Sequence, residues 1–138
     1  MADLAEVLAS IPLFTGLSKN ERRGVASHLK EDWFNAGDDI VTVEDKGGRL
    51  YVITEGRAKV IVNGKTLRKL GPGDYFGEMS LIDDSPRAAT VRADTGVKTV
   101  WIGRSNFLAL LQESWPMTRK ILSDLCARVR VADKNVAH

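Results

Sequence analysis

Residues 75–91 read YFGEMSLIDDSPRAATV, and they form the most informative stretch of this 138-residue chain. Gly77 permits a close approach of the backbone, and Glu78 to Ile82 is long enough for one short helix whose free N–H groups would face an anion. A single arginine, Arg87, then begins a strand, and Ala88–Ala89 leaves space beside its guanidinium. The planar fork of an arginine suits two oxygens of one phosphate. The segment therefore predicts an anion pocket.

Glu78 allows two interpretations. A carboxylate repels a neighbouring phosphate, unless it accepts a hydrogen bond from a hydroxyl at a fixed distance from that phosphate, as a ribose 2′-OH would supply. In the alternative, Glu78 and Arg87 form a surface ion pair in a loop, which would contribute about 0–1 kcal/mol. The spacing of the two residues alone favours neither.

The surrounding stretch, residues 32–103, is typical of short strands separated by turns. Asn63-Gly64 favours the type I′ turn that joins two antiparallel strands, and the last strand is predicted over Val97–Ile102. The flanks of this turn alternate: one face is predicted to hold Ala58, Val60 and Val62, and the other Arg57, Lys59 and Ile61, with Leu67 and Leu70 on the returning strand. Further turn signals occur at Asn35-Ala36-Gly37-Asp38, Asp45-Lys46-Gly47-Gly48, Glu55-Gly56 and Gly71-Pro72-Gly73-Asp74. Short strands at this spacing predict a small closed roll or barrel.

The N-terminal residues, 1–31, are predicted to be helical. Ser18 followed by Glu21 is a capping box that opens the second of two helices. The loop before it, residues 12–17, is too apolar for a free linker, so we expect it to pack against the core.

The C-terminal residues, 104–134, are predicted to form two further helices. We expect Ser105 to cap the first, and Pro116 suits the first turn of the second. We interpret Cys126 as a small buried residue of the second helix. Its apolar stripe comprises Met117, Ile121, Leu125 and Val129. Because this stripe could pair with a second copy, a homodimer through the C-terminal helix is one expectation, and the whole chain, 1–138, is expected to be a single domain.

Composition narrows the function classes. The apolar and charged fractions, 43% and 28%, are ordinary for a soluble protein, and no apolar run approaches the roughly 20 residues that span a bilayer. An acidic start without a signal-peptide core favours the cytoplasm. The net charge of +2 does not indicate nucleic-acid binding. His28 and His138 stand far apart, so no metal site is expected, and one cysteine excludes an internal disulfide.

The stretch from residue 8 to residue 129 resembles the cyclic nucleotide-binding domain shared by the catabolite activator protein, protein kinase A regulatory subunits and cyclic nucleotide-gated channels. The phosphate-binding cassette of that family reads F-G-E-φ-[SA]-L-x(4)-P-R-x-A-[TS]-V, where φ is apolar, and residues 76–91 match it at every fixed position. The resemblance implies an α+β fold: an antiparallel β-roll, similar to a jelly roll, with N-terminal helices, a short helix in the cassette and two C-terminal helices.

The resemblance also implies the ligand contacts. Arg87 should pair with the equatorial phosphate oxygen, Glu78 should accept the ribose 2′-OH, and the Gly77 backbone should lie close to the ribose. The ligand-binding residues expected in this way are Gly77, Glu78, Met79, Ser80, Arg87, Ala88, Ala89, Val60, Val62, Arg128 and Val129.

The expected base preference is cAMP before cGMP. Family members that favour guanine carry a threonine directly after the cassette arginine, and this chain has Ala88 there. Val60 and Val62 would form an apolar wall against the purine. Arg128 or Val129, on the last helix, would cap the base.

The most favoured function class is a sensor that binds a cyclic nucleotide and moves its C-terminal helix over the base. The alternatives are a piece or relative of a larger transcription factor, channel, kinase or cyclase regulator, and a degenerate roll used only for protein contacts. No enzyme activity and no cofactor are expected, because the cassette offers no nucleophile–base pair. An effector protein or a fused domain is the expected partner, with no binding of nucleic acid or membrane by the domain itself. The chain ends nine residues after Val129, which leaves no room for a helix-turn-helix.

The family's Gly-Asp before the Leu-Tyr-Val-Ile strand is replaced by Gly47-Gly48-Arg49, which we expect to loosen the turn without loss of the site.

Overall fold

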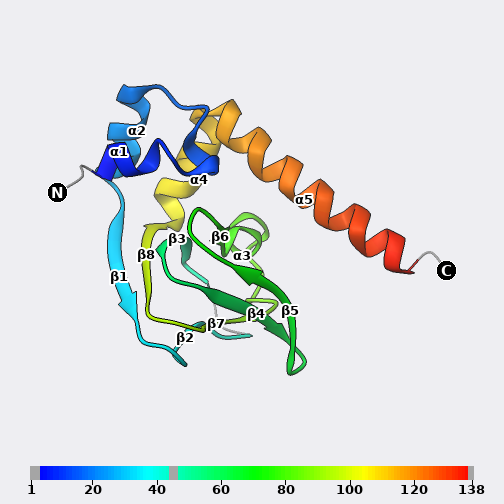
Figure 1. Ribbon diagram of the computed structural model, residues 1–138. Coiled ribbons are helices and arrows are strands. Elements are labelled where there is room, and N and C mark those ends of the chain that lie inside the picture. The colour runs from blue at the N-terminus through cyan, green and yellow to red at the C-terminus, as the bar shows by residue number, and fades with distance from the viewer. Residues whose placement is uncertain (1–3, 44–46, 137–138) are drawn as a thin grey trace.

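The computed structural model describes residues 4–43 and 47–136, which form two four-stranded antiparallel sheets with helices gathered at one end (Figure 1). The first sheet has the order β1 (Lys30–Phe34), β8 (Val97–Gly103), β3 (Arg49–Glu55), β6 (Tyr75–Phe76). The second has the order β2 (Asp39–Val41), β7 (Thr90–Ala93), β4 (Ala58–Val62), β5 (Lys65–Leu70). The helices are α1 (Leu4–Leu8), the 3₁₀ turn η1 (Pro12–Phe14), α2 (Lys19–Ala26), α3 (Glu78–Asp83), α4 (Arg104–Glu113) and α5 (Trp115–Val136). The predicted antiparallel roll with its cassette helix is confirmed.

Two apolar clusters fill the molecule. One joins the helical end to the first sheet and includes Phe14, Leu50 and Phe107. The other lies between the sheets and includes Ile53 and Val97. The predicted packing of the loop before α2 is confirmed, since its apolar side chains are buried and part of it winds into η1.

The capping box at the start of α2 is confirmed. The Glu21 N–H donates to Ser18 Oγ at 3.2 Å, and the Ser18 N–H donates to Glu21 Oε1 at 2.8 Å. The predicted cap of α4 by Ser105 is wrong. Strand β8 runs to Gly103 and the helix follows at once, so Gly103 takes the N-cap position and Ser105 already lies in the first turn.

The hairpin of β4 and β5 turns at Asn63 and Gly64, whose φ angles of 53° and 75° are both positive, as a type I′ turn requires. An ideal two-residue hairpin would place Val60 opposite Leu67. A bulge shifts the register, so that Val60 pairs with Arg68. Leu67 is consequently 68% exposed.

Helix α5 packs on the core with its first half, as far as Leu125. Pro116 lies in its first turn, as predicted, and Met117 and Ile121 are buried. The helix then leaves the roll (Figure 1), and Val129 is 58% exposed. Cys126 is also exposed, so its interpretation as a core residue is wrong. Asp124 and Arg128 face the roll, and Cys126 is two positions from each of them, which is a rotation of about 200° around the helix axis.

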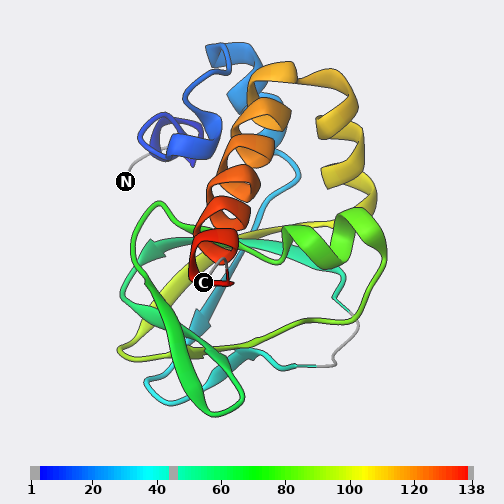
Figure 2. The same ribbon diagram turned by 90° about the vertical axis from the view of Figure 1, so that its right-hand side faces the viewer.

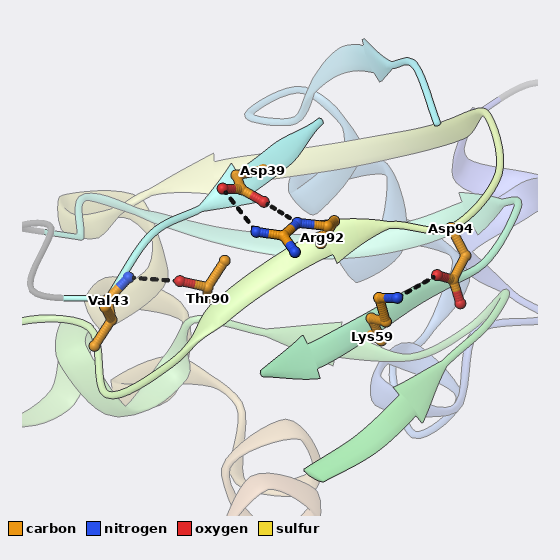
Figure 3. A network of polar contacts seen from close by, with 6 residues as sticks. All are labelled: Asp39, Val43, Lys59, Thr90, Arg92 and Asp94. Carbon is orange, nitrogen blue, oxygen red and sulfur yellow. Dashed lines mark hydrogen bonds and ion pairs between the residues drawn. The ribbon is translucent and has the colours of Figure 1, made fainter. Parts of the chain in front are cut away.

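A network of polar contacts on the outer face of the second sheet holds β2, β7 and β4 together (Figure 3). Asp39 accepts two hydrogen bonds from Arg92, at 2.7 and 3.4 Å, which raise the pKa of that guanidinium. The Val43 N–H donates to Thr90 Oγ1 at 3.0 Å. The network fixes the strand in which the cassette ends. The turn predicted at residues 45–48 lies partly outside the described residues, and His138 lies wholly outside them.

Candidate functional site

A cavity of about 460 Å³, open to solvent, lies between the second sheet, α3 and α5. It is lined by Val41, Val60, Arg68, Phe76, Gly77, Glu78, Met79, Ser80, Arg87, Ala88, Ala89, Val91 and Arg128. In Figure 2 the orange-to-red helix α5 comes down beside the green helix α3, and its C-terminal end lies in front of the strands of the roll. Segments distant in sequence therefore converge on one site.

Gly77 shapes the turn into α3. Its φ of +101° lies in the left-handed region, which favours glycine, and it is the N-cap of the helix. A Cβ at this position would stand 2.6 Å from the carbonyl oxygen of Arg49 and would also collide with the Arg87 guanidinium. The absence of a side chain thus lets the cassette backbone close onto Arg87.

Arg87 is held inside the protein, with 6% of its surface exposed. Its Nη2 donates a hydrogen bond of 2.9 Å to the main-chain oxygen of Arg49 in β3. The Arg49 side chain stacks on Trp101, with 3.8 Å between its Cζ and the ring centroid. On the other side, a Cβ at Gly47 would lie 2.5 Å from Arg87 Cζ. The guanidinium is therefore oriented by backbone on two sides.

Glu78 is 2% exposed, and its Oε1 lies 2.8 Å from Nη1 of Arg128. Arg128 reaches the carboxylate from α5, so this ion pair joins α5 to α3 at the cavity that both residues line. The alternative of a surface ion pair between Glu78 and Arg87 is wrong, since the carboxylate is buried and its partner is on another helix.

A second polar contact fixes α5 to the segment that begins the cassette. The Tyr75 hydroxyl donates to Asp124 Oδ2 at 2.6 Å, and Lys120 Nζ lies 2.9 Å from Asp124 Oδ1. Burial, and then the hydrogen bond to Asp124, raise the pKa of Tyr75 far above its ordinary value. Burial alone would raise the pKa of Asp124, but the bonds from Tyr75 and Lys120 outweigh it and hold that pKa low. Asp124 and Arg128 are one helical turn apart, so both face the cassette.

Nine of the eleven residues expected to bind ligand line this cavity, and the other two do not. Val62 is half-buried at the turn end of β4, and Val129 projects into solvent one residue beyond Arg128. Ligand contact by all eleven stays a prediction.

The sequence interpretation missed four residues that line the cavity: Val41, Arg68, Phe76 and Val91. Phe76 and Val91 stand in the cassette itself, at the two ends of the family pattern, and that position was the available signal. Arg68 had none, because the bulge in β5 decides which face it takes.

Among residues 4–43 and 47–136, no helix is long and apolar enough to cross a membrane. The same residues contain no group of three or more histidine, cysteine, aspartate or glutamate side chains placed to hold a metal ion.

Comparisons with known proteins agree with this geometry. The family model of the cyclic nucleotide-binding domain matches residues 31–114, more than half of the chain. The cAMP-dependent protein kinase regulatory subunit of Emericella nidulans is 40% identical over 106 residues, which cover 75% of this chain and 26% of the relative. The corresponding subunit of Eremothecium gossypii is 38% identical over 107 residues, which cover 77% of this chain and 23% of the relative. The chain thus spans about a quarter of the length of these curated relatives.

Solved structures show the same fold. A structure described as cAMP-bound PfPKA-R (141–441) superposes with a TM-score of 0.84 at 26% identity, covering 96% of this chain and 46% of the other. The regulatory subunit of a cAMP-independent protein kinase A from Trypanosoma brucei superposes with a TM-score of 0.80 at 30% identity, covering 86% of this chain and 43% of the other. The catabolite activator protein of Thermus thermophilus superposes with a TM-score of 0.82 at 30% identity, covering 91% of this chain and 62% of the other. The chain belongs to the cyclic nucleotide-binding domain family.

Proposed function

We propose that the domain binds a 3′,5′-cyclic nucleotide, cAMP before cGMP, and that binding changes how α5 sits on the roll. The observation that carries the proposal is the placement of two buried side chains in one cavity: Glu78, the first residue of α3, and Arg87, which follows that helix in the chain. A cationic fork and a carboxylate acceptor side by side match a phosphate joined to a ribose hydroxyl.

The phosphate belongs at Arg87. Its guanidinium is already oriented by the Arg49 carbonyl, so little side-chain freedom is lost when a ligand binds. Backbone N–H groups near Ser80 and Ala88–Ala89 lie around the same part of the cavity and would bind the remaining oxygens.

The ribose belongs at Glu78. The Glu78 carboxylate is buried beside Arg128, and a carboxylate oxygen can accept a hydrogen bond from the 2′-OH. A 2′-deoxy ligand would leave the Glu78 carboxylate without this hydrogen bond, and an unsatisfied acceptor is costly in a buried site.

The base belongs against the second sheet, where Val60 offers an apolar wall and Ala88 supplies no hydroxyl for a guanine 2-amino group. Two curated relatives and one solved neighbour have cAMP in their names. The Trypanosoma brucei subunit is described as cAMP-independent, so family membership by itself does not decide the ligand. The preference for cAMP therefore rests on Val60 and Ala88.

The response belongs to α5. The ribose hydroxyl and Arg128 would share one carboxylate, so ligand binding changes the strength of the contact that holds α5 to the cassette. The exposed apolar residues Leu122 and Val131 on the same helix offer a surface to an effector protein, a fused domain or a second copy of the chain, in the cytoplasm. Since the named relatives are regulatory subunits, an effector of the protein kinase class is proposed first.

Titration calorimetry with cAMP, cGMP and 5′-AMP tests the proposal. We expect both cyclic nucleotides to bind, 5′-AMP to bind weakly, and Arg87→Ala or Glu78→Ala to weaken cAMP by roughly one to a few orders of magnitude. Arg57→Ala, which removes an exposed arginine, is the matched control. Wild-type affinity in either site variant would contradict the site. Failure of all three nucleotides would favour a roll used for protein contacts, and product analysis of the same mixtures would reveal any hydrolysis.

A further inference from the structure

The main-chain oxygen of Arg49 lies where the first sheet meets the cassette. It accepts the 2.9 Å hydrogen bond from Arg87 Nη2, and it is also an atom that a Cβ at Gly77 would strike. Arg49 is the first residue of β3, and its partner in the ladder is Gly103, the last residue of β8. Because strand ends are weakly held by their own ladders, the position of this oxygen depends on what holds the Arg49 side chain.

The Arg49 side chain is held on the first sheet at three points. Its Cζ lies 3.8 Å from the centroid of the Trp101 ring. Its Nη1 donates to the Tyr51 hydroxyl at 3.4 Å and lies 3.8 Å from Asp32 Oδ2. Trp101 stands directly opposite Tyr51 in the sheet, two positions from the partner of Arg49, and a diagonal neighbour at this spacing is within reach of long side chains. A planar guanidinium stacks well on an indole face, so the ring fixes the direction in which Arg49 extends.

This stack lies in a second hollow, separate from the candidate ligand cavity. The second hollow is lined by Ile40, Val41, Gly47, Gly48, Arg49, Tyr51, Arg87 and Trp101, and no residue of α3 is among them. Arg87 lines both hollows, whereas Arg49 and Trp101 line only the second. A ligand in the first cavity would therefore feel the stack through Arg87.

The link from the stack to Arg87 is a single main-chain atom. An arginine fork binds two oxygens of one phosphate only when the plane of the guanidinium is correctly set. The Arg49 oxygen sets this plane at Nη2, and a shift of the oxygen would tilt the fork or lengthen the hydrogen bond. Groups that bind a ligand depend in this way on the residues that orient them.

We propose that Trp101 and the Arg49 side chain are positioning residues for the phosphate: their stack holds the Arg49 carbonyl, and the carbonyl sets the plane of the Arg87 guanidinium. The inference rests on the proposed function. The carbonyl itself is present in every substitution of residue 49, so an effect of such a substitution on binding reports a change in its position.

Titration with cAMP and with its two phosphorothioate diastereomers tests this. In each diastereomer sulfur, a larger and weaker acceptor, replaces one of the two exocyclic phosphate oxygens. The wild-type domain should favour the diastereomer that keeps oxygen at Arg87. Arg49→Ala and Trp101→Leu should weaken cAMP by about two- to fivefold, the size of one partly exposed cation–π contact, and should bring the ratio of the two diastereomer affinities closer to one.

A conservative variant and a matched control separate positioning from a general effect on the fold. Trp101→Phe keeps an aromatic face and should retain most of the affinity and of the diastereomer ratio. Trp33→Leu removes another stacked indole of the first sheet, on which Lys98 Nζ lies 4.9 Å from the ring centroid, but neither residue lines the two hollows. Its affinity and ratio should equal those of the wild type. Circular dichroism and the melting temperature establish that each variant is folded.

The Arg49 side chain is 43% exposed, so Arg49→Ala carries the test even where loss of Trp101 unfolds the domain. An unchanged affinity and ratio in Arg49→Ala would overturn this proposal alone. A loss of cAMP affinity with an unchanged ratio would overturn it as well, because the phosphate would not be the part of the ligand that is affected. A wild-type domain that binds none of the three nucleotides would overturn the proposed function and this inference with it.

Discussion

The Glu78 carboxylate of α3 and the Arg128 guanidinium of α5 lie 2.8 Å apart, with the carboxylate almost fully buried. One acid therefore joins the cassette to the C-terminal helix. Loss of a partner from a buried ion pair leaves the other charge uncompensated, which costs more than the pair contributes when both partners are present.

Arg128→Ala should lower the free energy of unfolding of the ligand-free domain by about 1–3 kcal/mol, discounted because Arg128 itself is partly exposed. Urea denaturation measures this. Arg130→Ala, on the exposed side of the same helix, should stay within about 0.5 kcal/mol of wild type. In a double-mutant cycle with Glu78→Gln, a coupling energy near zero would contradict the pair.

Asp124→Asn should destabilise the domain more at neutral pH than in acid. The pKa of Asp124 is lowered in the folded state, so its contribution is present above the unfolded value of about 3.9 and is lost as the pH falls through the lower folded value. We expect the free energies of unfolding of the wild type and the variant to differ by less than about 1 kcal/mol at pH 7, and by still less near pH 3. Thermal unfolding of both proteins at the two pH values checks it, and a gap that widens in acid would refute the assignment.

Gly77→Ala should disturb both stability and ligand binding. The left-handed φ would cost about 1–2 kcal/mol, and the new Cβ would press on the Arg49 carbonyl that orients Arg87. Gly24→Ala is the matched control: it lies within α2 with open space around its Cβ, and it should stabilise by about 0.5–1 kcal/mol. Equal effects at the two sites would show that the contact with Arg87 is unimportant.

Cys126 should react with an aromatic disulfide reagent in the native protein at a rate close to that of the urea-unfolded chain, because its thiol is exposed on α5. Strong protection in the native state would mean that this face of the helix is covered. A fluorophore attached there would also report whether cAMP changes the surroundings of α5.

Much of the site was predictable because it is local in sequence. The cassette pattern, the capping box at Ser18 and the type I′ turn at Asn63 each depend on residues a few positions apart, and the structure confirms the elements that they predicted. Val60 faced the cavity as its alternation indicated.

The remaining features depend on tertiary packing. Alternation along β5 could not reveal the bulge that turns Arg68 inward and Leu67 outward. The apolar stripe of α5 could not show where the roll ends, and so Cys126 was misplaced. The partner of Glu78 was equally hidden, since Arg128 is fifty residues away and reaches it only through the angle at which α5 crosses the roll.

The length of α5 beyond its packed first turns has a mechanical consequence. The 22-residue helix is about 33 Å long, and its contacts with the core run from Met117 to Leu125. Residues 129–134 are exposed, so this end of the helix is a lever arm whose pivot lies in the core. A tilt of about 10° at the pivot would carry the far end through roughly 5 Å. Under the proposed function, a small change in the contact at Glu78 would become a larger displacement at the far end of α5.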